Sequence, residues 1–206
     1  MNSLKNYLAN LVRNVRGISS IFRQRGQVAE EILVETTWKL YRKHSDEIII
    51  ILGIEDMPKI TITVENQIDF PAATSGTELI LNQKYFQGKK DEGAIIHEFA
   101  HLFQRCPRYD KETSWLIEGI GDYVRDVLGY VEEWSNPHYE QGMALKGYQT
   151  TAHFLIWLEN FHLGGVKELS RCLVKDTYSA DSFHEIFGYT LEELVQTYEE
   201  KFSITV

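Results

Sequence analysis

Cysteine, proline and long apolar runs are all scarce in this chain of 206 residues. The two cysteines, Cys106 and Cys172, are too few for the disulfide framework of a small secreted domain, and we expect both to be reduced. With only four prolines, a flexible linker between domains is not expected. The longest apolar run, residues 48–52, is far shorter than the roughly 20 residues of a membrane span. These absences favour one globular core without a transmembrane segment.

Positive charge is concentrated at the N-terminal end. The net charge is −9, and residues 1–29 hold five basic residues and no acidic one, which leaves −14 for the remainder. Such an acidic body is unsuited to phosphate backbones, so we expect no nucleic-acid binding. We divide the chain into a basic N-terminal segment, residues 1–26, that is helical or frayed, and a single domain over residues 27–206.

The basic segment permits more than one interpretation. Its leucines and valines recur at near-helical spacing, which is compatible with weak contact to a membrane surface. We favour two simpler interpretations: a helix that docks on the acidic domain, or a frayed terminus. The segment lacks the continuous apolar stretch of a secretory signal peptide, so we expect a cytoplasmic protein.

The order of the predicted elements indicates an α+β fold. Strands are predicted near residues 47–54, 59–65 and 77–82. Helices are predicted over residues 27–44 and, in the last third, over about 143–162, 166–175, 180–187 and 191–202. The fold would combine a small N-terminal mixed β-sheet, an active-site helix and a mostly helical C-terminal half. We expect residues 77–82 to be the sheet edge on which an extended peptide pairs.

The H-E-x-x-H motif at residues 97–101 indicates a chemistry. Residues four apart lie on one face of an α-helix, so His97 and His101 can direct two imidazole nitrogens at one metal ion. Glu98 flanks that face, where a general base for metal-activated water belongs. Asp91 is the expected cap of this helix. A surface helix whose histidines share a face by chance is the alternative, but the apolar neighbours predict burial, and buried imidazoles need a partner.

A second amphipathic helix is predicted to begin after Ser114 as its N-cap. Its Glu118 and Asp122 are four residues apart and project from one face. This spacing fits Glu118 as a third zinc ligand and Asp122 as the carboxylate that holds a ligand imidazole by its second nitrogen. The alternative is that both carboxylates belong to a solvated helix face. If Glu118 is not a ligand, Asp122 or His138 becomes the candidate third ligand.

These two helices resemble the basic secretory protein family of plant and bacterial peptidases. The matching runs are Gly93–Gln104, Leu116–Arg125, Ala73–Gly76 and Gly147–Leu155. The resemblance covers most of residues 46–203, and residues 1 to about 45 have no counterpart. Plant members are secreted and basic, whereas this sequence is acidic, so compartment and substrate are not carried over.

The resemblance implies a zincin-like fold of the glutamate-ligand class. In that class His97, His101 and Glu118 hold zinc and Glu98 is the base. Both the residues and the resemblance therefore predict a zinc-dependent peptidase that acts on a peptide or protein substrate. A non-catalytic, metal-stabilised binding protein and a zinc hydrolase of a non-peptide amide remain as alternatives on the same scaffold.

Aromatic residues near the motifs are candidates for the cleft. Tyr148 opens the helix after the second motif and is our candidate donor to the oxyanion, with an ordinary aromatic at the core edge as the alternative. Trp115, Tyr123 and Trp134 are expected to line the cleft, although large aromatics are common in cores.

Overall fold

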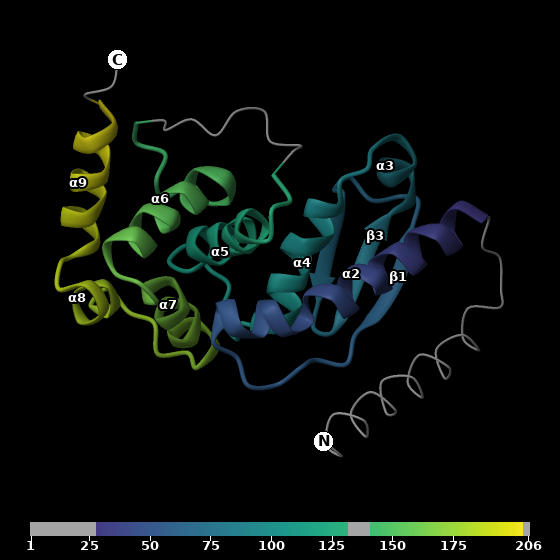
Figure 1. Ribbon diagram of the computed structural model, residues 1–206, viewed down its shortest axis with the longest axis horizontal. Helices are drawn as coiled ribbons and strands as arrows, with labels where there is room; N and C mark the ends of the chain where they lie inside the picture. Colours follow the sequence, from purple (N-terminus) through teal and green to yellow (C-terminus); the bar gives the residue numbers. More distant parts are fainter. Residues whose placement is uncertain (1–27, 132–140, 204–206) are drawn as a thin grey trace.

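The computed structural model describes residues 28–131 and 141–203 (Figure 1). It confirms an α+β fold with a small mixed sheet. Helix α4, Glu92–Gln104, lies between that sheet and helix α5, Ser114–Val127, and the later helices lie beyond α5 (Figure 1). Among the described residues, no helix combines the length and apolarity that a membrane span requires. The expectations for residues 1–26 fall outside the described part of the chain.

The sheet has three strands in the order β1–β3–β2. Strand β1, Thr61–Glu65, runs parallel to β3, Glu78–Asn82, whereas β2, Ala72–Ser75, runs antiparallel to β3. Strands β1 and β3 agree with the predictions, but β3 is the central strand, so the prediction that residues 77–82 form the sheet edge is wrong. The edge beside α4 is β2, whose small and weakly apolar side chains give no strand signal in the sequence.

Helix α2 is longer than predicted and replaces a predicted strand. It spans Val28–Leu52, whereas the sequence suggested a helix that stops at residue 44 and a strand near 47–54. In the isoleucine run, Ile48 and Leu52 are 0% exposed while Ile50 is 66% exposed. A strand would place these three residues on one face, so their burial follows the helical period. Burial of this face in the core outweighs the strand preference of β-branched residues.

Helices α4 and α5 begin differently. Asp91 caps α4 as predicted, because its carboxylate accepts a hydrogen bond from Ala94 N at 3.0 Å. The same carboxylate accepts a bond from Arg125 of α5 at 2.8 Å and so ties the two helices together. The prediction of Ser114 as the N-cap of α5 is wrong. Thr113 precedes the helix, and its hydroxyl binds the preceding loop and makes no capping bond.

Five more helices complete the described part of the chain. Helix α3 follows β3 directly, and the C-terminal half holds four more: α3 Gln83–Gly88, α6 Tyr148–Phe161, α7 Gly165–Val174, α8 Ser182–Phe187 and α9 Leu191–Ser203. The four later helices agree with the predicted ranges, except that α6 begins at Tyr148 rather than near residue 143. Helix α5 packs most extensively against α6. Both cysteines are free, as expected.

Candidate active site

Two helices bring three side chains to one point. On α4, the Nε2 atoms of His97 and His101 lie 2.9 Å apart. From α5, Oε2 of Glu118 lies 3.2 Å from Nε2 of His97 and 3.6 Å from Nε2 of His101. All three side chains are largely buried. The structure thus places the three residues that the sequence suggested as metal ligands in one cluster.

The spacing of these three atoms suits a tetrahedral metal site. Two atoms that each lie about 2.0–2.1 Å from a zinc ion are separated by about 3.3 Å at the tetrahedral angle. The observed separations of 2.9, 3.2 and 3.6 Å fall on both sides of that value. Imidazole nitrogen and carboxylate oxygen are also donors that zinc accepts. The residues present therefore fit a zinc ion.

Asp122 holds one of the two imidazoles from behind. Its Oδ1 lies 2.7 Å from Nδ1 of His97. Because a carboxylate can only accept, Nδ1 carries a proton and Nε2 faces the cluster. Burial disfavours the charged form of His97, but hydrogen bonds to Asp122 and Glu118 outweigh it and raise the pKa to about 10. Nδ1 of His101 is buried and has no hydrogen-bond partner within the described ranges, so His97 is the more firmly oriented imidazole.

Two carboxylates approach the histidines in different surroundings. Together with the two histidines, Glu98 forms a cluster whose ligand atoms lie within 4.8 Å of one another, which is looser than the Glu118 contacts. Burial raises the pKa of Glu98, against the nearby histidines and a hydrogen bond with Thr74 of β2. Burial also disfavours charge on Glu118, but hydrogen bonds from both imidazoles hold its pKa well below the usual range. Glu118 is therefore the better ligand and Glu98 the better proton acceptor.

The two helices can approach closely because α5 has no side chain at Gly121. A Cβ atom at this position would lie 2.7 Å from Cε1 and 2.8 Å from Nδ1 of His97. Such separations are too short for any real side chain, so the imidazole lies directly against the α5 backbone. The sequence pattern gave no reason to single out this glycine, because close approach depends on how the helices cross.

Two tyrosines flank the cluster. The ring of Tyr148 stacks on His97 with centroids 5.8 Å apart and planes 16° apart. Burial, followed by the charge of Glu118, raises the pKa of Tyr148. Tyr109 donates a hydrogen bond from Oη to Oε1 of Glu118 at 2.7 Å. Sequence reasoning missed Tyr109, because it lies in the irregular α4–α5 connection, where residue spacing carries no signal.

A cleft of about 920 Å³ opens over the cluster. One wall comes from β2 and its flanking residues, and the opposite wall comes from α4, α5 and Tyr148. The expectation that Trp115 and Tyr123 line this cleft is wrong: Tyr123 is buried in the core, and the indole of Trp115 donates to Glu112 O. Its aromatic lining is Phe70, Tyr85, Tyr109 and Tyr148. Trp134 and His138 lie outside the described residues.

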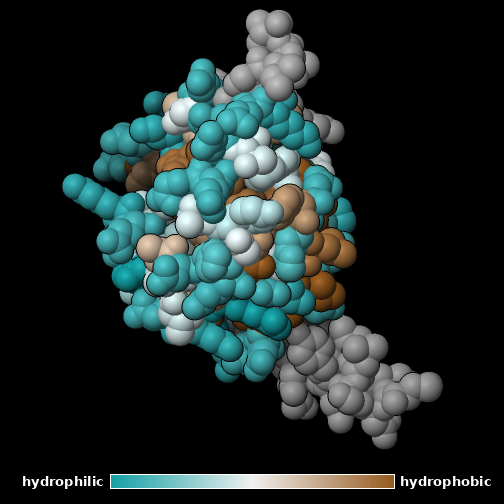
Figure 2. All heavy atoms as spheres, turned by 90° about the vertical axis from the view of Figure 1, so that its left-hand side faces the viewer, coloured by the Kyte–Doolittle hydropathy of each residue, from teal (hydrophilic) through white to brown (hydrophobic). Residues whose placement is uncertain are grey.

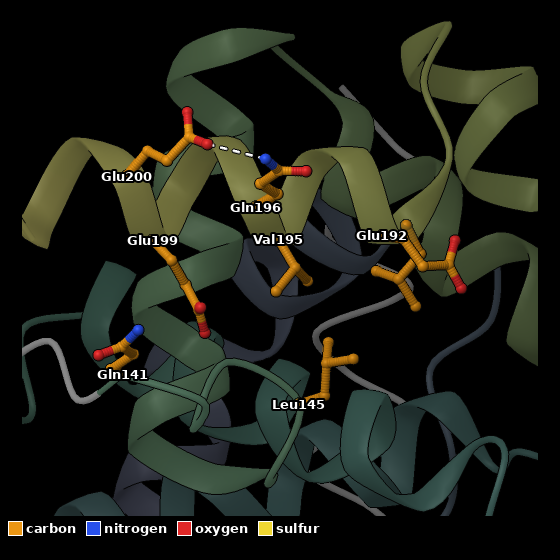
Figure 3. A pocket seen from close by; sticks show the side chains of 8 residues that line it. Gln141, Leu145, Glu192, Val195, Gln196, Glu199 and Glu200 are labelled. Carbon is orange, nitrogen blue, oxygen red and sulfur yellow. Dashed lines mark hydrogen bonds between the residues drawn. The ribbon is translucent and has the colours of Figure 1, made fainter.

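A second hollow lies far from this chemistry, on the mostly hydrophilic side of the molecule that carries α9 (Figure 2). It measures about 740 Å³ and lies between α9 and residues 141–145 (Figure 3). Leu145 and Val195 face each other across it, and Glu199 accepts a hydrogen bond from Gly142 N at 2.7 Å. Among the described residues, its lining consists of aliphatic, amide and acidic side chains without histidine or cysteine, and the H-E-x-x-H residues line the first cleft.

A comparison with protein families agrees with the resemblance seen in the sequence. The model of the BSP family, described as peptidase of plants and bacteria, matches residues 14–198. The expectation that residues 1 to about 45 have no counterpart is therefore wrong from residue 14 onward. This part of the chain has no chemical motif by which the sequence could be aligned with the family. No curated protein and no solved structure matches the chain. Because the family model covers most of its length, the chain belongs to the BSP family of plant and bacterial peptidases.

Proposed function

We propose that this peptidase depends on zinc and that its scaffold is zincin-like. His97, His101 and Glu118 would hold the ion. The observation that carries the proposal is the convergence of three donor atoms within 3.6 Å of one another, from two helices. The small mixed sheet beside the H-E-x-x-H helix is also the arrangement expected of that scaffold.

Glu98 is proposed as the general base and then the general acid. When bound, zinc supplies Lewis acidity, which polarises the scissile carbonyl and lowers the pKa of the attacking water toward about 7. Glu98 accepts the water proton on its carboxylate and delivers it to the leaving amine. Burial raises the pKa of Glu98 and so makes it a stronger proton acceptor than a solvated carboxylate.

Asp122 and Tyr148 are proposed to support the reaction, the first by orienting a ligand and the second by binding the oxyanion. Asp122 accepts a hydrogen bond from Nδ1 of His97, so Nε2 is the nitrogen that can become a ligand when the metal displaces its proton. Tyr148 is proposed to donate its hydroxyl to the developing oxyanion. Burial raises its pKa, so the hydroxyl stays protonated and can donate at neutral pH. Loss of one oxyanion donor typically lowers kcat by about 10²–10³-fold.

Strand β2 is the proposed docking edge for the substrate. Within the described residues, β2 pairs only with β3, so its other edge faces the cleft. An extended peptide can add to such an edge through main-chain hydrogen bonds, with side chains alternating between the two faces. Thr74 of β2 bonds to Glu98, so a peptide paired there would pass directly by the proposed base.

Metal content and one substitution test the proposal. Purified protein should contain about one zinc ion per chain, and a chelator should abolish hydrolysis of a peptide library. Glu98→Gln preserves shape and should retain zinc while lowering hydrolysis by at least about 10²-fold. Glu92→Gln is the matched control, because Glu92 is an exposed residue of the same helix.

Each result separates the alternatives. Hydrolysis that survives complete metal removal would contradict zinc dependence. A zinc-loaded protein that cleaves no peptide would instead support a metal-stabilised binding protein or a hydrolase of a non-peptide amide. Unchanged activity in Glu98→Gln would remove Glu98 as the base while leaving the metal site in place.

A further inference from the structure

The oxygen of Glu118 that points away from the histidines already has a partner. Tyr109 Oη donates to Oε1 at 2.7 Å, whereas Oε2 is the atom that faces the two imidazoles. Tyr109 is 63% exposed, so its ring does not serve to fill the core. The hydrogen bond to the Glu118 carboxylate is therefore the contact that accounts for the position of Tyr109.

The loop that carries Tyr109 is fixed by its own hydrogen bonds. Oδ1 of Asp110 accepts a bond from Thr113 N at 3.1 Å, and the Thr113 hydroxyl donates to Arg108 O at 3.2 Å. Arg108 in turn donates from Nη2 to Tyr178 O at 3.2 Å, which anchors the loop to the segment between α7 and α8. These bonds hold both residues that flank Tyr109 in sequence. The hydroxyl is thus presented to Glu118 by a pre-organised backbone.

We propose, resting on the zinc site proposed above, that Tyr109 is a positioning residue that fixes the rotation of the Glu118 carboxylate. With Oε1 held by Tyr109, the carboxylate presents Oε2 alone to the metal. Without that bond, the carboxylate can turn about its last side-chain bond and exchange its two oxygens. Tyr148 also forms a side-chain hydrogen bond with Glu118, but its ring stacks on His97 and the backbone at the start of α6 sets its position.

The substitution Tyr109→Phe keeps the ring and removes only the hydroxyl. A hydrogen bond from a hydroxyl to a carboxylate is charge-assisted and stronger than a neutral one. Loss of such a partner of a metal ligand typically weakens metal binding by about 10–100-fold. Water can replace part of the bond at this exposed position, so we expect about a 10-fold higher Kd for zinc. Competition with a chromogenic chelator measures this Kd.

The same substitution in a protein that lacks the Glu118 carboxylate shows whether the change in zinc affinity depends on Glu118. In Glu118→Ala there is no carboxylate to orient, so adding Tyr109→Phe should change the zinc Kd by less than about 2-fold. Tyr189→Phe is the control for loss of a tyrosine hydroxyl, because Tyr189 is half-exposed, packs on Phe161 and does not line the cleft. The Tm of the metal-free protein should be the same for Tyr109→Phe and wild type.

The visible absorption spectrum of the Co(II)-loaded protein gives an independent readout of ligand arrangement, and Tyr109→Phe should alter it. A wild-type protein that binds no zinc would overturn the proposed function itself. Zinc binding by wild type with the same Kd and the same cobalt spectrum in Tyr109→Phe would overturn only the role of Tyr109. An equal loss of zinc affinity in both backgrounds would also overturn it, because the effect would then not pass through Glu118.

Discussion

Replacing Gly121 with alanine should weaken metal binding while the fold survives. The added Cβ would lie 2.7 Å from Cε1 of His97, whereas ordinary contacts begin at 3.4 Å, so the imidazole or the helix must move by about 0.7 Å. Movement of the ring alone is opposed on its other sides by the stacked Tyr148 and by the bond to Asp122. Metal–ligand distances tolerate only about 0.2 Å. The displacement therefore exceeds what a zinc site accepts.

The substitution is expected to affect the free energy of unfolding less than it affects the zinc affinity. Overpacking of a close contact costs about 1–3 kcal/mol. Alanine in place of glycine inside a helix recovers up to about 1 kcal/mol of helix propensity. The metal-free Gly121→Ala protein should therefore be less stable than wild type by about 0–2 kcal/mol, which a protein of this size can survive. Its zinc Kd, in contrast, should rise at least about 10-fold.

Urea denaturation of the metal-free protein and chelator competition for zinc measure the two quantities separately. Gly88→Ala is the matched control, because a Cβ atom there meets nothing within 4 Å and its φ is not positive. That variant should bind zinc as wild type does. If Gly121→Ala also bound zinc with wild-type affinity, the inference that His97 is a ligand pressed against α5 would be refuted.

Two further predictions concern buried polar groups. Asp91→Ala removes the cap of α4 and leaves the buried guanidinium of Arg125 without its carboxylate. The free energy of unfolding, measured by urea denaturation, should therefore fall by about 3–5 kcal/mol. In the control Glu35→Ala, which breaks an exposed pair with Lys39, it should change by less than about 1 kcal/mol. Burial raises the pKa of Cys106 to about 12, so its alkylation by iodoacetamide at pH 8 should be much slower in the folded than in the urea-unfolded chain, as peptide mass spectrometry would show. Since the folded state favours the neutral thiol, this residue's contribution to stability should decline as the pH rises from about 9 toward 12, and equal alkylation rates in both states would contradict its burial.

The parts of the site that repeat along a helix could be predicted from the sequence. His97 and His101 are one turn apart on α4, and Glu118 and Asp122 are one turn apart on α5. Each pair shares a face for reasons of helix geometry alone, so local spacing was enough to group them. The prediction that the two pairs contact each other rests on the H-E-x-x-H chemistry and the family resemblance, because neither spacing reveals how the helices cross.

The parts that depend on tertiary contacts could not be predicted. The isoleucines at the end of α2 favour a strand by local preference, and burial of one helical face in the core makes them helical. Strand β2 has no strong local preference and exists because β3 pairs with it. Tyr109 reaches Glu118 from an irregular loop, and Gly121 matters only because an imidazole of another helix lies against it. In each case the decisive partner lies in another element or loop, so the residue spacing within one element does not reveal it.

The part of the cleft wall above His97 is the ring of Tyr148, and its position depends on the backbone at the start of α6. Tyr148 has a φ of +49°, directly after Gly147 with a φ of +86°, and this left-handed pair of residues sets where the aromatic ring stands. A Cβ at position 147 would also approach Cβ of Glu118 to 3.4 Å. A residue without a side chain thus governs where the aromatic ring over His97 stands.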